Sequence, residues 1–520
     1  MLDIPRALLT ALYRAAVEGA APFPRTQRAV ASWLAARPDL SEAASARVHC
    51  IALGKAAPAM FSGAARAIAD AGHVIAGGVV VCASAAGQGD LPEHVRLFVG
   101  DHPVPGPGSL EAGDGIDDAI QEVGPGDIVV VLLSGGTTAL AAAPVAALSQ
   151  ALGDAERAQA HIANLAETLL ESGLAIHEMN AIRRRMLRWG AGRLAVALHS
   201  RGAAAIPVFA ISDVIGDDPS VIGSGPCTAD PFDDATFLAL LDAHNVRNSL
   251  ERGMAQFLGI VGGGTVPAVP SPSHPAFSLV QYEVVASNAD SLRALASAAR
   301  ASGIDQVIVE REPLAGDAAT LGDALARRVL ASAARVPRGA RALYVAGGEP
   351  VVHLRSTFER AWSEDDDDAS SPMNPFLVRM DRDVTAETRT DADLDVDFMR
   401  GSGSQAGSAD EPMRGGRMQL LALAAALAFE EAGAHGNRDV RRVTLLAAGT
   451  DGRDGPTDAA GAIVDSAVPA LARRAGRIPE TDAATGRSYY PLDAAGALLK
   501  PGPTGTNVMD IVAVLVDATR

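Results

Sequence analysis

Cysteine is scarce in this sequence of 520 residues: Cys50, Cys82 and Cys227 are the only three, and no two form a CxxC pair. This spacing supports neither a disulfide framework nor a zinc site built from cysteines. Nowhere do about 18 uncharged apolar residues follow one another, so no segment is predicted to span a membrane. The N-terminal stretch 1–20 reads as an amphipathic helix interrupted by charges and not as a signal peptide, so we expect a cytoplasmic protein.

Positive charge is also in deficit. The chain has 44 basic and 62 acidic residues and a formal net charge of −18, which repels a polyanion and argues against general nucleic-acid binding. Among the basic residues only Lys55 and Lys500 are lysines. A coding bias toward arginine explains the scarcity, and a lysine kept against that bias marks a candidate position where a compact ammonium group is required.

Apolar residues gather in short runs, each ending in a glycine or a polar cluster. Continuous Val, Ile and Leu without alternation predicts strands buried on both faces, as in parallel sheets. Alanine-rich helical segments such as 149–173 and 287–303 separate the runs, and this alternation predicts an α/β chain of βαβ units. The predicted strands lie within 48–56, 77–87, 96–103, 127–136, 205–218, 305–313, 341–349 and 441–455.

The length of the chain predicts two domains, or three. The stretch 255–278 is rich in Gly, Pro and Ser and reads as a linker, so we expect domains at 1–255 and 279–520. A second irregular segment, 355–413, holds 15 acidic and 6 basic residues. Its alternating aspartates lack the Gly and the distal Glu of an EF-hand loop, and a solvated insertion is favoured over a cation site.

In α/β sheets, ligands bind beyond the carboxyl ends of the strands, and a glycine turn follows one predicted strand here. In VLLSGGTTAL (131–140), Ser134, Gly135, Gly136 and Thr137 lead into a predicted helix. Consecutive backbone N–H groups, two hydroxyls and a helix dipole together predict a cradle for phosphate.

A second pair of glycines opens the predicted helix 414–433, with Arg414 and Arg417 at its positive end. Arginines there do not complement the helix dipole. A neighbouring anion explains this placement, and a surface salt bridge is the alternative explanation.

Carboxylates follow two other predicted strands. They are Asp213, Asp217 and Asp218 after the first, and Asp451, Asp454 and Asp458 after the second. Mg²⁺ usually takes one or two carboxylates plus phosphate oxygens. We favour Asp213 and Asp451 as metal ligands over the turn and cap roles that aspartates also fill.

Several familiar nucleotide motifs are missing. Gly54-Lys55 is no Walker A motif, because His49 stands where the first glycine should be and Ala56 follows the lysine. No GxGxxG follows a strand, which weakens a nicotinamide-binding interpretation. No HRD or DFG set occurs, so protein-kinase chemistry is unsupported.

The ordered set of motifs resembles the MOFRL-type glycerate 2-kinases, the bacterial class II glycerate kinases. The matching blocks run in the family's order over nearly the whole chain, and the last two are long and specific. They are GKA (54–56), HPVPG (102–106), LLSGGTTAL (132–140), NAIRR (180–184), SDVIGDDPSVIGSGP (212–226), SN (287–288), GGE (347–349), GGRMQ (415–419), GTDGRDGPTDAAGA (449–462) and GPTGTNVMD (502–510).

The resemblance implies two α/β domains, each with a mainly parallel sheet flanked by helices. The first would be Rossmann-like, the second would contain the MOFRL region at about 341–515, and the active site would lie in the cleft between them. The implied reaction is ATP- and Mg²⁺-dependent phosphorylation of D-glycerate to 2-phosphoglycerate.

The resemblance also assigns site residues by position. It points to Lys55 and Arg417 as the principal charged residues, with Asp213, Glu349 and Asp451 in the same cleft. The residues expected to hold the cofactor are Gly54, Ser134, Gly135, Gly136, Thr137, Asn288, Thr504 and Asn507.

This chain departs from the family pattern at Gly190, where a lysine is usual, at Met418 and Leu420 beside the GGR motif, and at Lys500. Two alternatives therefore stay open: an NAD(P)H-dependent hydroxypyruvate or tartronate reductase, and a non-catalytic ligand-binding relative. We expect no nucleic-acid or membrane partner, and a monomer or homodimer.

Overall fold

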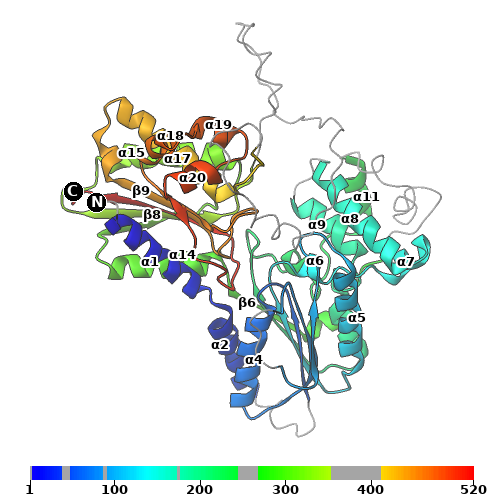
Figure 1. Ribbon diagram of the computed structural model, residues 1–520. Coiled ribbons are helices and arrows are strands. Elements are labelled where there is room, and N and C mark those ends of the chain that lie inside the picture. The colour runs from blue at the N-terminus through cyan, green and yellow to red at the C-terminus, as the bar shows by residue number, and fades with distance from the viewer. Residues whose placement is uncertain are drawn as a thin grey trace.

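The computed structural model describes residues 3–37, 47–85, 91–171, 176–243, 268–352 and 411–519. Their strands form two six-stranded sheets, each with helices packed on it, in two lobes (Figure 1). Most of the predicted linker at 255–278 and most of the acidic insertion at 355–413 lie outside the described residues.

The first sheet is entirely parallel, with the strand order β3-β2-β1-β4-β5-β6. In doubly wound folds with this order, ligands bind where the order reverses, which here is between β1 and β4. The predicted Rossmann-like sheet is confirmed. Its strands are β1 (Val48–Leu53), β2 (Ile75–Cys82), β3 (Val95–Val99), β4 (Ile128–Leu133), β5 (Ile206–Ile211) and β6 (Val280–Ala286).

Two separate cores cover the two faces of this sheet. The helices that pack on the two faces are α2 (Pro22–Ala35), α4 (Ala57–Asp70), α5 (Pro107–Gln121) and α10 (Arg193–Ser200). In β1, Cys50 and Ala52 pack in the core under α2 and α4, whereas Ile51 and Leu53 pack in the core under α5 and α10. Burial of successive residues on opposite faces explains why the strand sequence shows no polar alternation.

A cluster of helices with its own core lies beside this sheet. It comprises α7 (Ala146–Leu152), α8 (Ala155–Glu171), α9 (Ile176–Met186) and α11 (Asp234–Ala243). The predicted helix 149–173 is thus interrupted, because Gly153 takes φ +104° between α7 and α8.

The second sheet has the order β11-β10-β9-β12-β8-β7, and only the β7–β8 pair is parallel. The prediction of a mainly parallel second sheet is therefore wrong, although the α/β class is confirmed. β12 is buried along its whole length, and an apolar run predicts such burial without indicating strand direction. The strands are β7 (Gln306–Val309), β8 (Arg341–Gly348), β9 (Val443–Gly449), β10 (Gly461–Val464), β11 (Leu498–Leu499) and β12 (Asp510–Asp517).

Helices also cover both faces of the second sheet. They are α1 (Asp3–Gly19), α14 (Asn288–Ala301), α15 (Ala318–Ala333) and α17 (Arg417–Ala434). α1 and α14 share one core with β8, β9 and β12, and α15 and α17 share the other. The short elements are α6 (Thr137–Leu140), α18 (Val468–Arg474), α19 (Pro479–Ala484), α20 (Tyr489–Ala494) and the 3-10 helices Ile222–Ser224, Pro275–Leu279 and Arg438–Arg442.

Two segments differ from the predicted domain limits. α1 packs against α14 and the second sheet, although it lies at the N-terminus (Figure 1). β6 pairs with β5 and so extends the first sheet to Ala286. In the described chain, no helix has both the length and the apolarity needed to cross a bilayer.

Candidate active site

Two turns interlock where the strand order of the first sheet reverses. Gly54, after β1, has φ +117°, and a Cβ there would lie 2.3 Å from the Ser134 hydroxyl oxygen. The backbone N–H of Lys55 donates to the carbonyl oxygen of Gly135 at 2.9 Å, and that of Ala56 donates to Ser134 Oγ at 3.0 Å. Glycine is required at position 54 because only it permits this backbone conformation and this close approach.

The glycine loop after β4 offers backbone N–H groups, and its hydroxyls are already engaged. Thr137 Oγ1 lies 2.9 Å from the Leu53 carbonyl oxygen and 2.7 Å from that of Ser134. Within the described residues, the N–H groups of 135–138 donate no hydrogen bond. The helix that follows, α6, has only four residues, so the predicted contribution of a helix dipole is small. Any phosphate would bind to backbone N–H groups, as in anion-binding nests.

Asp213 follows β5 and packs directly on this loop. A Cβ on Gly135 would lie 2.0 Å from Asp213 Oδ2, and the side-chain amide of Asn507 donates to the same oxygen at 3.4 Å. Asn507 belongs to the segment that precedes β12 in the second sheet. Predicted site residues from both lobes therefore meet here.

Charge and burial alter the acidity of Asp213. Burial raises the pKa of Asp213 to about 6, and the negative charge of Glu349 adds to this rise, whereas the positive charges of Lys55 and Arg417 oppose it. The electrostatic coupling indicates that these four side chains lie near one another. A carboxyl group with a pKa this close to neutral is suited to accepting a proton.

Arg417, at the start of α17, is held by two carboxylates. Its Nε donates to Asp510 Oδ2 at 2.5 Å and its Nη1 to Glu349 Oε1 at 2.9 Å. Burial raises the pKa of Asp510 to about 6, and Arg417 opposes that rise. For Arg417, burial alone would lower the pKa, but the two carboxylates outweigh it and hold the pKa above its usual range.

The anion expected at the start of α17 belongs to the protein itself. Asp454 accepts hydrogen bonds from the backbone N–H groups of Met418 at 3.1 Å and Gln419 at 2.7 Å. Burial, reinforced by the charge of Asp510, raises the pKa of Asp454 to about 7. This side chain complements the helix dipole, so the first N–H groups of α17 are satisfied by the protein and not by a ligand.

The remaining predicted residues lie close by but are partly engaged. Asp451 Oδ1 accepts from the backbone N–H of Arg453 at 3.0 Å, and the charge of Asp451 raises the pKa of Asp510. Thr504 Oγ1 donates to the Thr450 carbonyl oxygen at 2.6 Å.

Asn288 is buried and supports the chain at the site. Its amide donates to the carbonyl oxygens of Val508 at 2.8 Å and Asp510 at 3.0 Å. It therefore fixes the backbone between Asn507 and β12.

No preformed metal cluster exists in the described ranges: nowhere do three His, Cys, Asp or Glu side chains converge to hold an ion. Mg²⁺ usually needs only one or two protein carboxylates, with phosphate oxygens and water completing its shell. The separate carboxylates of Asp213 and Asp451 fit that kind of site.

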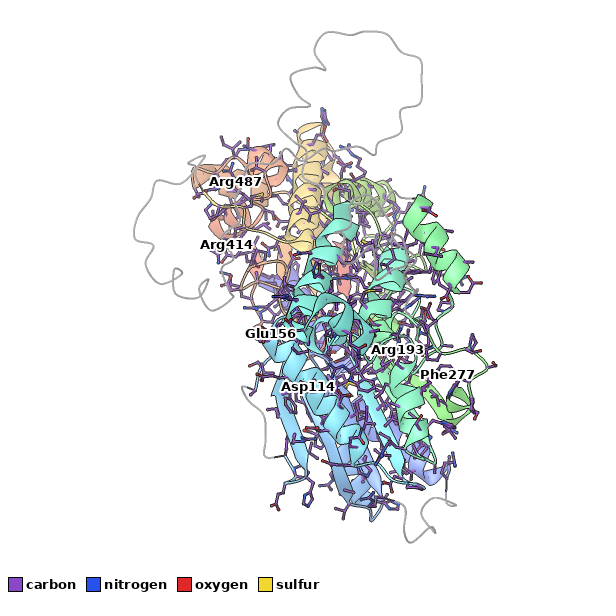
Figure 2. The ribbon with its side chains drawn as sticks, turned by 90° about the vertical axis from the view of Figure 1, so that its right-hand side faces the viewer. Asp114, Glu156, Arg193, Phe277, Arg414 and Arg487 are labelled. Atoms are coloured by element: carbon purple, nitrogen blue, oxygen red, sulfur yellow. The ribbon has the colours of Figure 1, made fainter. Side chains whose placement is uncertain are left out.

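Three departures from the family pattern are accommodated by packing. A Cβ on Gly190 would lie 2.7 Å from the carbonyl oxygen of Arg184, so a larger residue does not fit here without movement. Arg193, labelled in Figure 2, donates to the Leu187 and Gly190 carbonyl oxygens at 3.1 and 3.3 Å and fixes this turn. Met418 and Leu420 are buried in the core beneath α17, where apolar side chains are stabilising.

Asp510 and Tyr13 are site neighbours that sequence reasoning missed. The Tyr13 hydroxyl donates to the Gly449 carbonyl oxygen at 2.9 Å, which ties α1 to the end of β9. For Asp510 a signal existed: it is an aspartate at the start of the apolar run DIVAVLVD. Nothing in the sequence around Tyr13 indicates that α1 lies here.

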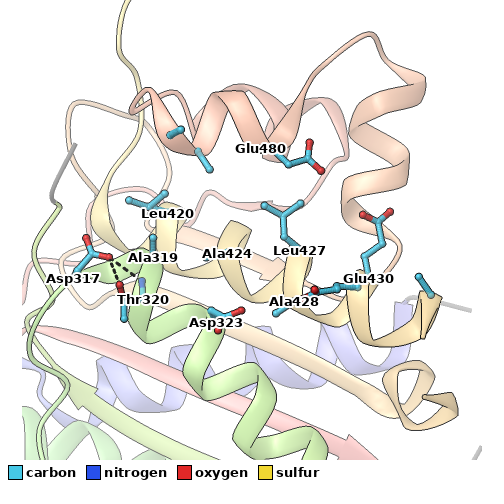
Figure 3. Close-up of a pocket in the computed structure, with 14 residues that line it drawn as sticks. Asp317, Ala319, Thr320, Asp323, Leu420, Ala424, Leu427, Ala428, Glu430 and Glu480 are labelled. Atoms are coloured by element: carbon cyan, nitrogen blue, oxygen red, sulfur yellow. Dashed lines mark hydrogen bonds between the residues drawn. The ribbon is translucent and has the colours of Figure 1, made fainter. Parts of the chain in front are cut away.

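A larger cavity than the one beside the glycine loop lies in the second lobe. It has a volume of about 760 Å³, lies between α15, α17 and α19 (Figure 3), and includes Leu420 in its lining but none of the predicted site residues. Its acidic rim is only partly neutralised, because Asp323 and Glu431 share Arg327, and Glu430 and Glu480 share Arg473. A smaller cavity of about 240 Å³ borders Gly136.

Replacing Asp213 by asparagine should stabilise the fold at alkaline pH while lowering activity. Because the pKa of Asp213 is raised in the folded state, the protonated side chain is the form that favours folding. The contribution of Asp213 to stability is therefore complete below about pH 4 and is lost as the pH rises through about 6. We expect Asp213→Asn to raise the free energy of unfolding at pH 8 by on the order of 1–3 kcal/mol. Urea unfolding at pH 8 and pH 4 measures this, and an equal effect at both values would contradict the assignment.

The chain matches two family models: the domain of unknown function DUF4147 over residues 8–259, and the MOFRL family over residues 405–510. A glycerate 2-kinase from Pyrococcus horikoshii is 30% identical, over 91% of this chain and 88% of its own. A relative from Agrobacterium vitis, named provisionally as a hydroxypyruvate reductase, is 29% identical over 92% of this chain and 89% of its own. The crystal structure of a glycerate kinase from Thermotoga maritima superposes with a TM-score of 0.66 at 25% identity, covering 98% of this chain and 99% of that one.

Proposed function

The chain belongs to the glycerate kinase family, and from this premise we propose that it transfers the γ-phosphoryl group of ATP, with Mg²⁺, to D-glycerate, giving 2-phosphoglycerate. Membership of this family implies that the chain is a kinase that phosphorylates glycerate with a nucleotide as the phosphate donor. The observation that supports the finer statement is the packing of Lys55 and Asp213 on a glycine loop whose N–H groups donate no hydrogen bond within the described residues, with the charge of Arg417 acting on Asp213.

In phosphoryl transfer the protein mainly positions the reactants and stabilises negative charge. We assign the N–H groups of the glycine loop to the nucleotide phosphates. A Cβ on Gly136 would lie 3.1 Å from Lys55 Cγ, so the Lys55 ammonium is placed to neutralise the transferred group. Arg417, oriented by Glu349 and Asp510, supplies the second positive charge from the other lobe.

Asp213 is our candidate for the proton acceptor. It takes the proton of the attacking glycerate hydroxyl, whose oxygen forms the new bond to phosphorus while the bond from phosphorus to the bridging oxygen of ADP breaks. Its raised pKa places it near neutrality, where a general base is most effective. Mg²⁺, when bound, neutralises phosphate charge, and Asp451 is the carboxylate that we assign to it.

Asp451→Asn tests the metal assignment. Asparagine keeps the side-chain oxygen that accepts the Arg453 N–H, so folding should be nearly unchanged, whereas the charge that a hard cation prefers is lost. We expect the Mg²⁺ concentration for half-maximal activity to rise about tenfold or more, with the melting temperature preserved. A variant with unaltered Mg²⁺ dependence and turnover would make Asp451 a turn residue only.

A direct assay separates this function from the reductase alternative. Purified protein is supplied in parallel with ATP, Mg²⁺ and D-glycerate, and with NADH and hydroxypyruvate. We expect ADP formation that requires D-glycerate, and no oxidation of NADH. Oxidation of NADH without ADP formation would replace the proposal by the reductase, and the absence of both would favour a non-catalytic relative.

A further inference from the structure

The cavity of about 240 Å³ beside the glycine loop is built like a small-anion site. Its lining includes Gly136 and Thr138 of the glycine loop, His102, and Asn180 and Arg183 of α9; the rest of the lining is apolar. Pockets for drug-sized ligands span about 300–1,000 Å³. This cavity therefore suits a ligand of only a few carbon atoms.

Arg183 is the unpaired member of a run of three arginines. Arg184 lies 2.9 Å from Asp230, and Arg185 lies 2.6 Å from Asp234. Arg183 makes no hydrogen bond or ion pair with any residue in the described part of the chain, and burial lowers its pKa without an opposing carboxylate. A half-buried guanidinium without a counter-ion is less stable than a paired one, so a ligand anion would compensate it.

Asn180 strengthens this interpretation. It lies three residues before Arg183 on α9, and side chains at that spacing share one face of a helix. Both residues line the cavity, and the described structure gives the Asn180 amide no protein partner. A planar guanidinium fork with an adjacent amide matches the two oxygens of a carboxylate.

The cavity also adjoins the reaction centre. The Cβ position on Gly136 is 3.1 Å from Lys55 Cγ and 3.4 Å from His102 Cδ2, so Lys55 and the cavity share Gly136 as a neighbour. An acid whose carboxylate is bound at Arg183 can therefore extend its hydroxyl carbon toward Lys55 and the glycine loop.

We propose that Arg183 and Asn180 form the subsite that binds the carboxylate of the acceptor, which makes Arg183 a specificity-determining residue. This inference rests on the proposed function, because it takes glycerate as the acceptor. The other oxyanion available in the reaction is a nucleotide phosphate, and the experiment distinguishes the two.

The test compares wild type, Arg183→Gln and Arg183→Lys, with Arg188→Gln as the control. Arg188 lies just after α9, is half-buried, and pairs with Asp114 and Asp117; it does not line the cavity, so its variant loses a nearby arginine but not the cavity. KM is measured for D-glycerate, for its uncharged amide glyceramide and for ATP, and D-glycerate binding is measured by calorimetry without nucleotide. Because Arg183 has no protein partner to lose within the described residues, the two Arg183 variants should keep the wild-type melting temperature.

For Arg183→Gln we expect KM and the dissociation constant for D-glycerate to rise about 10- to 10²-fold, the range for losing a charge-assisted pair. KM for glyceramide and for ATP should stay within about twofold, and Arg183→Lys should be intermediate because it keeps the charge but loses the fork. Arg188→Gln should match wild type.

Unchanged D-glycerate KM and affinity in Arg183→Gln would overturn the proposal, and so would a rise in KM for ATP alone, which would assign the cavity to a phosphate. Failure of wild type to phosphorylate D-glycerate would count against the proposed function instead. In that case the calorimetric comparison still decides whether Arg183 binds the carboxylate.

Discussion

Lys55→Arg is expected to turn over at a rate on the order of 10²-fold below wild type, nearly as low as Lys55→Ala, the scale of losing one preorganised electrostatic group. Lys55 stands where the Gly54 turn packs on Ser134, and its stem passes close to Gly136. A guanidinium is a broad planar fork and an ammonium a compact point charge, so arginine keeps the charge and misplaces it. Steady-state kinetics of the two variants measure the effect.

Lys500→Arg is the matched control, because it is the same substitution at the only other lysine. Lys500 pairs with Asp458 and Asp493, both at 3.2 Å, and should tolerate arginine with turnover close to wild type. The Lys55 side chain is exposed, so melting temperatures should not change in either variant. If Lys55→Arg keeps most of its turnover, position 55 needs only a diffuse positive charge.

Gly135→Ala is expected to cost about 10²-fold or more in kcat/KM with little loss of stability. Gly135 does not need a positive φ, so alanine brings no backbone strain, but its Cβ would lie 2.0 Å from the Asp213 carboxylate. That contact forces Asp213 away from the loop, and a displacement of about 1 Å at a reacting group can reduce the rate 10²-fold. Turnover measured beside a thermal melt separates the two effects.

Gly433→Ala serves as the comparison for Gly135→Ala. Gly433 lies near the end of α17, and a Cβ there would meet only the side chain of Val440 at 3.2 Å. Alanine in a helix is favoured over glycine by about 1 kcal/mol, so this variant should be at least as stable as wild type and fully active. Activity of Gly135→Ala equal to that of Gly433→Ala would show that the contact between the loop and Asp213 does not matter.

The sequence predicted most of the strand framework and missed particular strands for physical reasons. Every predicted strand is present, because each is an apolar run flanked by turn residues; β7 is mostly exposed in the structure, but its run Val307–Val309 is still apolar. β6 was not predicted because its first residues alternate between partly buried and exposed, as is usual at the edge of a sheet, and so do not form a continuous apolar run. β12 is a buried run but enters the second sheet antiparallel to both neighbours, and no local pattern encodes that pairing.

For the candidate site, sequence reasoning found charges but not their pairings. Lys55, Asp213 and Arg417 were selected from positions after strands or by family resemblance, and the described structure brings them within electrostatic reach of one another. The 93 residues that separate Arg417 from Asp510 leave no local signal for their ion pair. The hydroxyls of Ser134 and Thr137 looked available in the sequence but are engaged by backbone groups.

Phosphorus NMR of the product formed from ATP, Mg²⁺ and D-glycerate tests the central claim most directly. The account predicts a new phosphate-ester resonance split into a doublet by the single proton on carbon 2, appearing together with ADP, and absent when Lys55→Ala replaces the wild-type protein. A triplet from the two protons of carbon 3 would contradict the assigned hydroxyl. No ester resonance at all from wild-type protein would contradict the kinase assignment itself.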